Sequence, residues 1–142
     1  MRALVTGGAG FAGSHLTEYL LGQGGEVTVL AAEQEDLGNI SELLGRIRVE
    51  RADLRDAPGL LSLLRSWIPD RIYHLAALSS PSDSIRNPGV TYEVNLLVTL
   101  NLLLACRQLV NVPRFLLVSS SEIYGAVDAA QMPLREDMPL RP

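Results

Sequence analysis

The fold of this 142-residue chain is decided by the stretch Thr6-Gly7-Gly8-Ala9-Gly10-Phe11-Ala12-Gly13-Ser14-His15-Leu16. Gly7, Gly10 and Gly13 recur every third residue, between an apolar run at residues 2–6 and a helical pattern that follows. At such a turn the first glycine permits a tight bend, the second lets a pyrophosphate approach the backbone, and the third lets helix and sheet pack closely. A plain strand-to-helix turn has the same glycines, but the strand before it and the helix after it favour a dinucleotide-binding turn, with helix N–H groups facing the anion.

Short apolar runs alternate with longer helical patterns along the rest of the chain. Strands are predicted at Arg2–Thr6, Glu26–Ala31, Ile47–Glu50, Arg71–Leu75 and Arg114–Ser119. Helices are predicted at Phe11–Leu21, Leu37–Leu44, Ala57–Trp67 and Val90–Val110. The alternation is typical of βαβ units and predicts an α/β fold, a Rossmann-like doubly wound parallel sheet with helices on both faces. We expect the longest helix to be buried on more than one side, because it is apolar around most of its circumference. The residues from Gly125 onward, with three prolines, are expected to form a loop.

Composition and charge exclude several classes of protein. With 47% hydrophobic and 20% charged residues, the chain has the balance of a globular domain with one core. Its net charge is −4 and its 12 basic residues, all arginine, are scattered, so no nucleic-acid partner is expected. The uncharged stretch Val94–Cys106 is shorter than the roughly 20 residues of a membrane span, and the start shows no signal-peptide pattern. We therefore expect a cytoplasmic protein without a membrane partner.

Two residue types that often carry chemistry are scarce here. Cys106 is the only cysteine and lies in an apolar helical run, which predicts a buried, inert thiol. His15 and His74 have no partners at metal-ligand spacing, so no metal site is predicted.

Acidic residues after the second predicted strand indicate which dinucleotide the turn would hold. An acidic residue near this strand end binds the ribose 2′-OH of NAD, whereas an arginine accepts the 2′-phosphate of NADP. Glu33 lies close to the strand end, with Glu35 and Asp36 after it. No basic residue occurs between Arg2 and Arg46, so a 2′-phosphate would meet three carboxylates and no nearby cation. NAD is favoured over NADP, and a solvated loop charge is the alternative for Glu33.

Five motifs occur along the chain in a fixed order. They are Thr6 to Gly13, Ala52-Asp53-Leu54, His74-Leu75-Ala76-Ala77, Asn95, and Ser119-Ser120-Ser121-Glu122-Ile123-Tyr124-Gly125. Together they resemble the extended short-chain dehydrogenase/reductases that act on nucleotide sugars, and the resemblance covers essentially the whole chain. Within that family the likeness is closest to GDP-mannose 4,6-dehydratases and 4-keto-6-deoxy sugar-nucleotide reductases. UDP-hexose 4-epimerases and dTDP-glucose 4,6-dehydratases come next.

The resemblance implies cofactor contacts at several strand ends. In the glycine turn, the resemblance implies that Phe11 and Ala12 contact the cofactor. Asp53 resembles the acid that meets the adenine amino group, with Leu54 beside the ring; a helix N-cap or a loop carboxylate is the alternative. Leu75-Ala76-Ala77 resembles the small-residue strand end along the nicotinamide half. Asn95 resembles the helix asparagine that tethers neighbouring backbone.

The resemblance also implies catalytic and substrate-binding residues. Ser120 falls where the family has a catalytic Ser or Thr, which donates to the sugar oxygen at C4 while hydride moves between C4 and the nicotinamide. Glu122 falls where 4,6-dehydratases place the base that removes the C5 proton, although related reductases carry the same Ser-Ser-Glu. Ser79 and Ser84, in the loop after the fourth strand, and Ser121 are the implied substrate contacts. A polar strand end or a turn is the alternative for these serines.

The family's Tyr-x-x-x-Lys motif cannot be formed, because neither Tyr92 nor Tyr124 is followed by a lysine. We therefore expect residues 1–142 to form part of an NAD(P)-binding Rossmann domain, without the last strands and the C-terminal substrate-binding domain, and to be inactive alone. Two interpretations stay open: the N-terminal part of a nucleotide-sugar enzyme, or a noncatalytic NAD-binding module. Because relatives dimerise through the corresponding helix, a homodimer through residues 90–110 is also expected.

Overall fold

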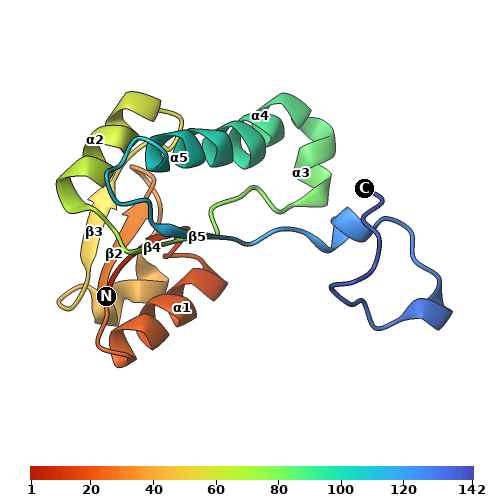
Figure 1. Cartoon of the computed structure of the whole chain (residues 1–142), viewed down its shortest axis with the longest axis horizontal. Helices are drawn as coiled ribbons and strands as arrows, with labels where there is room; N and C mark the ends of the chain where they lie inside the picture. The colour runs from red at the N-terminus through yellow and green to blue at the C-terminus, as the bar shows by residue number, and fades with distance from the viewer.

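The computed structural model describes residues 1–142 and contains one sheet of five parallel strands, in the order β3-β2-β1-β4-β5 (Figure 1). The strands are β1 (Arg2–Thr6), β2 (Glu26–Ala31), β3 (Arg48–Arg51), β4 (Arg71–His74) and β5 (Arg114–Leu117). The helices are α1 (Phe11–Gly22), α2 (Ala57–Trp67), α3 (Pro81–Arg86), α4 (Pro88–Tyr92) and α5 (Val98–Cys106). The strand order reverses between β1 and β4, which is where open α/β sheets bind their ligands.

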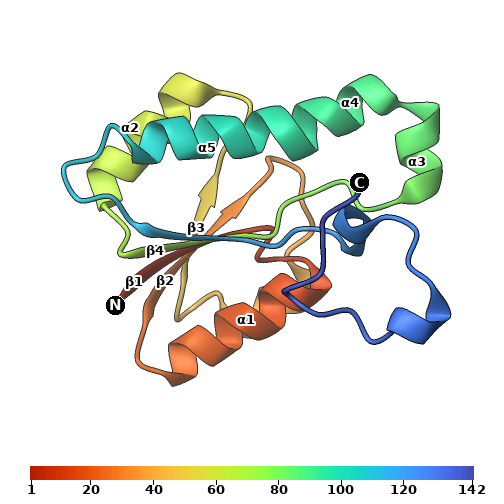
Figure 2. The same ribbon diagram turned by 45° about the vertical axis from the view of Figure 1, so that its right-hand side comes forward.

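Helices cover both faces of the sheet, as Figure 2 shows, with α2 and α5 on one face and α1 on the other. The central strand β1 supplies both cores, because alternate residues of a strand point to opposite faces. Leu4 joins the larger cluster, which includes Leu64 of α2 and Leu102 of α5. Ala3 and Val5 join a smaller cluster on the α1 face. The expected fold class, a Rossmann-like parallel sheet with helices on both faces, is confirmed.

Most predicted elements are present with small shifts at their ends. The bounds of β1, β2 and α2 are as predicted. The boundaries of α2 have clear local causes, since the Asp56 carboxylate accepts from the Gly59 N–H at 3.2 Å at its start and Ile68 has a φ of +46° at its end. The predicted helix at 37–44 is a 3₁₀ helix, η1 (Gly38–Leu43).

The long helix differs from its prediction. The continuous helical stretch runs from Pro88 to Cys106, through the π-helical segment η2 (Glu93–Leu97) between α4 and α5. The expectation of burial on several sides is wrong, because only one side faces α2 and the sheet; Leu100 and several other apolar residues of this stretch are about half exposed. At 19 residues the stretch has the length and apolar composition of a membrane span, a property that core helices share. Cys106 is buried, and burial raises the pKa of its thiol to about 11, as expected for an inert thiol.

Candidate functional site

The glycine turn that follows β1 packs directly on the chain that leaves β4. Gly7 has a φ of +67°, and a Cβ at this position would lie 2.8 Å from the backbone nitrogen of Ala76. The Gly10 N–H donates to the Gly7 carbonyl at 3.1 Å, which closes the turn. Both the left-handed backbone and the close approach require glycine at position 7. The turn thus joins β1 and β4 at the reversal of strand order.

The start of α1 is shaped to receive an anion. A Cβ at Gly13 would lie 2.0 Å from the Gly7 carbonyl oxygen, so the helix lies directly against the turn. Gly10 precedes α1 without a capping side chain, and the first turn has no acidic residue, whereas α2 begins with a capping aspartate. Phe11 and Ala12 are exposed at this end. The uncapped N–H groups and the glycine cradle fit a pyrophosphate.

Of the three carboxylates after β2, only one is free of hydrogen bonds. The Glu35 carboxylate accepts from the Ala32 N–H at 3.0 Å, and the Asp36 carboxylate accepts from the Gly38 N–H at 3.0 Å. Glu33 is exposed, and its carboxylate has no hydrogen-bond partner in the chain. Glu33 is therefore the carboxylate available to a ribose hydroxyl at this strand end.

The same loop is hydrogen-bonded by an arginine side chain that lies far from it in the sequence. Arg51, at the end of β3, donates from Nη1 to the carbonyl oxygens of Ala32, Glu33 and Glu35, the last two at 3.0 and 2.9 Å. The expectation that no cation lies near this loop is wrong, because β2 and β3 are neighbours and Ala31 pairs with Arg51. The parallel pairing of two consecutive strands is the signal that could have located this arginine.

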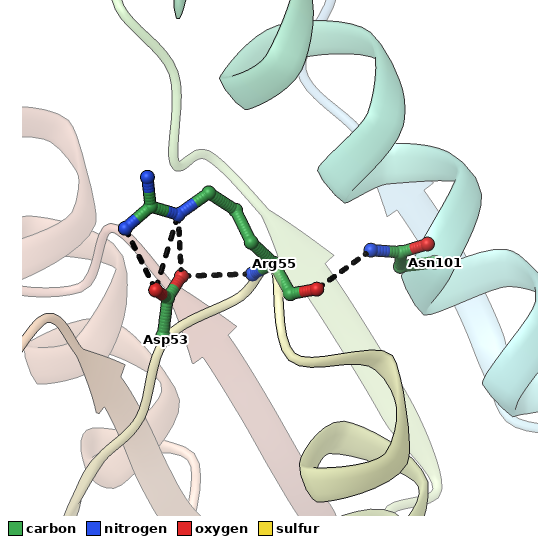
Figure 3. Close-up of polar contacts among 3 residues, drawn as sticks. All are labelled: Asp53, Arg55 and Asn101. Carbon is green, nitrogen blue, oxygen red and sulfur yellow. Dashed lines mark hydrogen bonds and ion pairs between the residues drawn. The ribbon is translucent and has the colours of Figure 1, made fainter.

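The loop after β3 carries an acid that is already paired (Figure 3). Arg55 donates from Nη2 to one Asp53 oxygen at 2.7 Å, and from Nε to the other at 2.9 Å, while the Asn101 amide donates to the Arg55 carbonyl at 3.4 Å. The Arg55 side-chain hydrogen bonds lower the pKa of Asp53 to about 2. Asp56 caps α2, so the helix N-cap alternative for Asp53 is wrong. Leu54 is half-buried against the core beneath α2.

The chain that leaves β4 is held by Thr6 of β1. The Leu75 N–H donates to the Thr6 carbonyl at 3.1 Å, and the Ala76 N–H donates to the Thr6 hydroxyl oxygen at 3.2 Å. Leu75 and Ala76 are half-buried, and Ala77 is exposed. These bonds fix the chain that leaves β4 beside the glycine turn.

Asn95 tethers this segment further along, as the resemblance implied. It lies in the π-helical segment η2, and its side chain accepts from the Leu78 N–H at 2.8 Å and donates to the Leu78 carbonyl at 3.0 Å. The amide thus replaces the backbone partners that Leu78 lost on leaving the sheet.

The serines after β5 are exposed. Ser120 accepts from the Glu122 N–H at 3.2 Å and so caps the short helix η3 (Ser121–Tyr124), which leaves its hydroxyl proton free to donate. The Glu122 carboxylate is exposed and has no hydrogen-bond partner. In Figure 2 this segment, α3 and the start of α1 all lie at one end of the sheet.

The two serines after β4 lie in different surroundings. Ser79 is exposed in the connection to α3. Ser84 lies within α3 and donates to the Pro81 carbonyl at 2.7 Å, so its predicted place in a loop is wrong. The helix forms because Ser80 caps it, accepting from the Asp83 N–H at 3.3 Å.

Comparisons with known proteins agree with this geometry. The GDP-mannose 4,6 dehydratase family matches residues 4–142. UDP-glucuronic acid decarboxylase 1 of Arabidopsis thaliana is 39% identical over an alignment that covers 96% of this chain and 29% of that protein. UDP-glucose 4-epimerase of Thermus thermophilus, solved in complex with NAD, is 41% identical with a TM-score of 0.86, covering 100% of this chain and 45% of that one.

A further solved structure carries a nucleotide sugar. UDP-glucose-4-epimerase of Stenotrophomonas maltophila, with NAD and formylated UDP-arabinopyranose, is 30% identical with a TM-score of 0.87, covering 99% of this chain and 43% of that one. The chain spans less than half the length of each of these relatives. The match over residues 4–142 confirms the resemblance in the motifs, and the chain belongs to the GDP-mannose 4,6 dehydratase family of the extended short-chain dehydrogenase/reductases.

Proposed function

We propose that this chain is the NAD-binding part of a nucleotide-sugar-modifying enzyme that uses hydride transfer at sugar C4. The observation that carries the proposal is the glycine turn, where Gly7 lies against the Ala76 backbone and the start of α1 is left uncapped. The similar epimerase solved with NAD supports this choice of cofactor. The one solved with a nucleotide sugar supports the substrate class.

The pyrophosphate and the nicotinamide half take adjoining places in this proposal. The pyrophosphate lies on Gly10 and on the N–H groups of Phe11 and Ala12, where helix dipole and free donors favour an anion. A Cβ at Gly10 would have a single close neighbour, the Gly7 carbonyl at 3.3 Å, so the space beside this glycine is open. The nicotinamide half lies along Leu75-Ala76-Ala77.

The adenosine half lies over the ends of β2 and β3. Glu33 accepts from the ribose 2′-OH, and Asp53 accepts from the adenine amino group with Leu54 beside the ring. NAD is preferred to NADP because the Glu33 carboxylate would repel a 2′-phosphate. Arg51, the nearest cation, directs Nη1 at three loop carbonyl oxygens.

The bound nicotinamide supplies the hydride acceptor and donor. In this proposal the Ser120 hydroxyl donates a hydrogen bond to the sugar oxygen at C4. In a 4,6-dehydration Glu122 takes the C5 proton before water leaves from C6, which is lyase chemistry. In a 4-keto reduction the same Ser120 contact serves, and Glu122 takes no proton from C5. Ser79, Ser84 and Ser121 are the proposed substrate contacts.

Two other functions stay as alternatives. A UDP-hexose 4-epimerase uses the same hydride transfer at C4 without removing the C5 proton, and it is favoured by the two solved neighbours. A noncatalytic NAD-binding module is favoured by the lack of any lysine in the 142 residues. The proposal also includes a homodimer through residues 90–110, several of whose apolar side chains are exposed, and a location in the cytoplasm.

Calorimetric titration with NAD and NADP tests the cofactor proposal directly. We expect measurable NAD binding and weaker or no NADP binding. Gly10→Ala should abolish NAD binding while leaving the unfolding temperature nearly unchanged, because the added methyl group occupies the pyrophosphate position and only one atom lies near it. Gly22→Ala, at the far end of α1 with no atom within 4 Å, is the matched control. Equal NAD affinity in the wild type and Gly10→Ala contradicts the proposal.

Turnover assays test whether the 142-residue chain is active alone. We expect the 142-residue chain to convert neither GDP-mannose nor UDP-glucose in the presence of NAD, because it has no lysine to hold the nicotinamide ribose. Product formation at a measurable rate would show that the chain holds a complete active site.

A further inference from the structure

A buried chain of hydrogen bonds connects the glycine turn to α5. His74 of β4 lies between two threonines, with Nδ1 2.6 Å from the Thr6 hydroxyl and Nε2 2.9 Å from the Thr99 hydroxyl. His74 is 1% exposed, Thr6 is fully buried and Thr99 is 8% exposed. Three elements that are far apart in the sequence therefore meet at one imidazole ring.

The partners of the two threonines fix where each proton lies. The Thr99 hydroxyl donates to the Asn95 carbonyl at 2.8 Å, and a carbonyl can only accept. The single hydroxyl proton of Thr99 is thus used, so Thr99 accepts from His74, which must carry a proton on Nε2. A neutral imidazole then has an unprotonated Nδ1, and the Thr6 hydroxyl donates to it. The lone pairs of the Thr6 oxygen remain for the Ala76 N–H at 3.2 Å.

With the protons in these positions, every polar group in the chain of hydrogen bonds has a partner. The chain of hydrogen bonds ends at the proposed cofactor site. Thr6 is the residue before Gly7, and it accepts from both N–H groups with which Leu75 and Ala76 leave β4. The Gly7 backbone and the Ala76 backbone are in direct contact. A rotation of the Thr6 side chain would therefore free the Ala76 N–H, against which the glycine turn packs, while the Leu75 N–H would stay bonded to the Thr6 carbonyl.

We infer that His74, as a neutral imidazole protonated on Nε2, is a positioning residue of the cofactor site that holds the Gly7 turn against Ala76, and that protonation of His74 weakens dinucleotide binding. The inference rests on the proposed function. A second proton on Nδ1 would have to be donated to Thr6, whose own hydroxyl proton would then lack an acceptor in a buried site. Acid thus breaks the one arrangement in which all partners are satisfied.

No charged group offsets a second proton on His74. Burial lowers the pKa of His74, and no carboxylate lies within ion-pair distance of the ring. The titratable groups on the strands and helices around it are Arg2, Arg71, Tyr73, Glu93, Cys106 and Arg114. Arg71 and Arg114 lie at the opposite ends of their strands, and Glu93 acts on Arg55. The Phe115 ring, 6.0 Å from the imidazole, is the aromatic neighbour.

Two NMR measurements on the 142-residue chain test the inference without any ligand. Nitrogen-15 spectra of the histidines should show His74 protonated on Nε2 and unprotonated on Nδ1 at pH 8. On acidification, the backbone amide signals of Gly7 and Ala76 should shift together with the titration of His74. The opposite tautomer, or amide signals that ignore this titration, overturns the inference whatever the cofactor affinity is.

Cofactor titrations between pH 8 and pH 5.5 supply the functional measurement. We expect the NAD dissociation constant to rise by up to about tenfold per pH unit below the point where His74 titrates, while the chain stays folded. Thr99→Val removes the acceptor of the Nε2 proton and should weaken NAD binding at pH 8. Thr28→Val is the matched control, because Thr28 is also buried and its hydroxyl has no hydrogen-bond partner.

The outcomes separate the inference from the proposed function. The His74→Gln variant should bind NAD weakly, and its NAD affinity should not depend on pH in this way. The His15→Gln variant should keep the pH dependence of the wild type. If the wild type binds no NAD at pH 8, the proposed function fails and the NMR titration still decides whether His74 controls the turn. If the wild type binds NAD equally above and below the pH at which NMR shows His74 to titrate, or Thr99→Val behaves like Thr28→Val, the inference fails and the proposed function stands.

Discussion

The guanidinium of Arg55 holds both carboxylate oxygens of Asp53, at 2.7 Å from Nη2 and 2.9 Å from Nε. The Arg55 N–H also donates to Asp53 at 2.9 Å, so the acid is fixed from the side chain and from the backbone. Because this pairing is complete without a ligand, the carboxylate proposed to meet adenine is already oriented in the free chain. Bidentate, charge-assisted hydrogen bonds from a guanidinium fix the orientation of a carboxylate and also stabilise its charged form.

Arg55→Gln should return the pKa of Asp53 from about 2 toward its ordinary value of 3.8. The pairing stabilises the fold above pH 3.8, and this contribution is lost as the pH falls from about 3.8 to about 2. Carbon-13 NMR of the aspartate carboxyl groups measures the shift. Arg65→Gln, which removes an exposed arginine with no acidic partner, should leave Asp53 unchanged, and an Asp53 that still titrates near pH 2 in Arg55→Gln contradicts the pairing.

Stability should also depend on pH through His74. Burial lowers the pKa of His74 in the folded chain below its ordinary value of 6.5, so the unfolded chain binds the proton more readily. The free energy of unfolding should therefore fall as the pH drops below about 6.5, by at most about 1.4 kcal/mol per pH unit. Urea unfolding at pH 7.5 and 5.5 measures this slope. His74→Gln should lose most of it, and an unchanged slope in that variant would assign the effect to other groups.

The sequence predicted the parts of the fold that local physics controls. The bounds of β1, β2 and α2 follow from apolar runs, an Asp56 cap and the proline after Ile68, all of which act within a few residues. The burial of the helix at 90–110 could not be predicted in the same way. Its apolar side chains cover most of its circumference, but which of them are covered depends on neighbours that periodicity does not reveal.

In the candidate site too, features set by local sequence were predictable, and features set by distant elements were not. The need for glycine at positions 7 and 13 was predictable, because a turn of fixed geometry between a strand and a helix determines it. Arg51 was missed because its partners are backbone carbonyl oxygens, which no residue pattern identifies, so only the parallel pairing of β2 with β3 could have located it. The proton order at His74 needed the partners of both threonines, which come from two other elements.

Two glycines of α1 should respond oppositely to the same substitution. Gly13→Ala places a methyl group 2.0 Å from the Gly7 carbonyl oxygen and should lower the free energy of unfolding by about 2 kcal/mol, together with NAD binding. The methyl group of Gly22→Ala would meet no atom within 4 Å. This substitution should raise the free energy of unfolding by about 0.5 kcal/mol, because alanine lowers the conformational entropy of the unfolded chain. Urea unfolding of both variants measures the difference, and similar effects at both positions would be inconsistent with close packing at Gly13.

Arg51 should control the affinity of the adenosine half. Arg51→Gln removes three hydrogen bonds to the loop at 32–35 and should raise the NAD dissociation constant about fivefold, equivalent to roughly 1 kcal/mol, by loosening the backbone that presents Glu33. Calorimetric titration measures the change. The control is Arg46→Gln, because Arg46 is an exposed arginine before β3 whose side chain makes no hydrogen bond or ion pair. Equal affinities in the two variants count against a role for Arg51.

The exposed side of the long helix should carry self-association. Leu96, Leu100 and Leu104 recur every fourth residue, so they lie along one side of the helix, and all three are exposed. A contiguous apolar surface of this kind marks an interface, and two opposed glutamates at its centre would place like charges in contact. Leu100→Glu combined with Leu104→Glu should therefore convert a dimer to a monomer in sedimentation velocity. Tyr19→Glu, a similar change at an exposed residue of α1, should leave the dimer intact. A dimer that survives the double substitution excludes this surface as the interface.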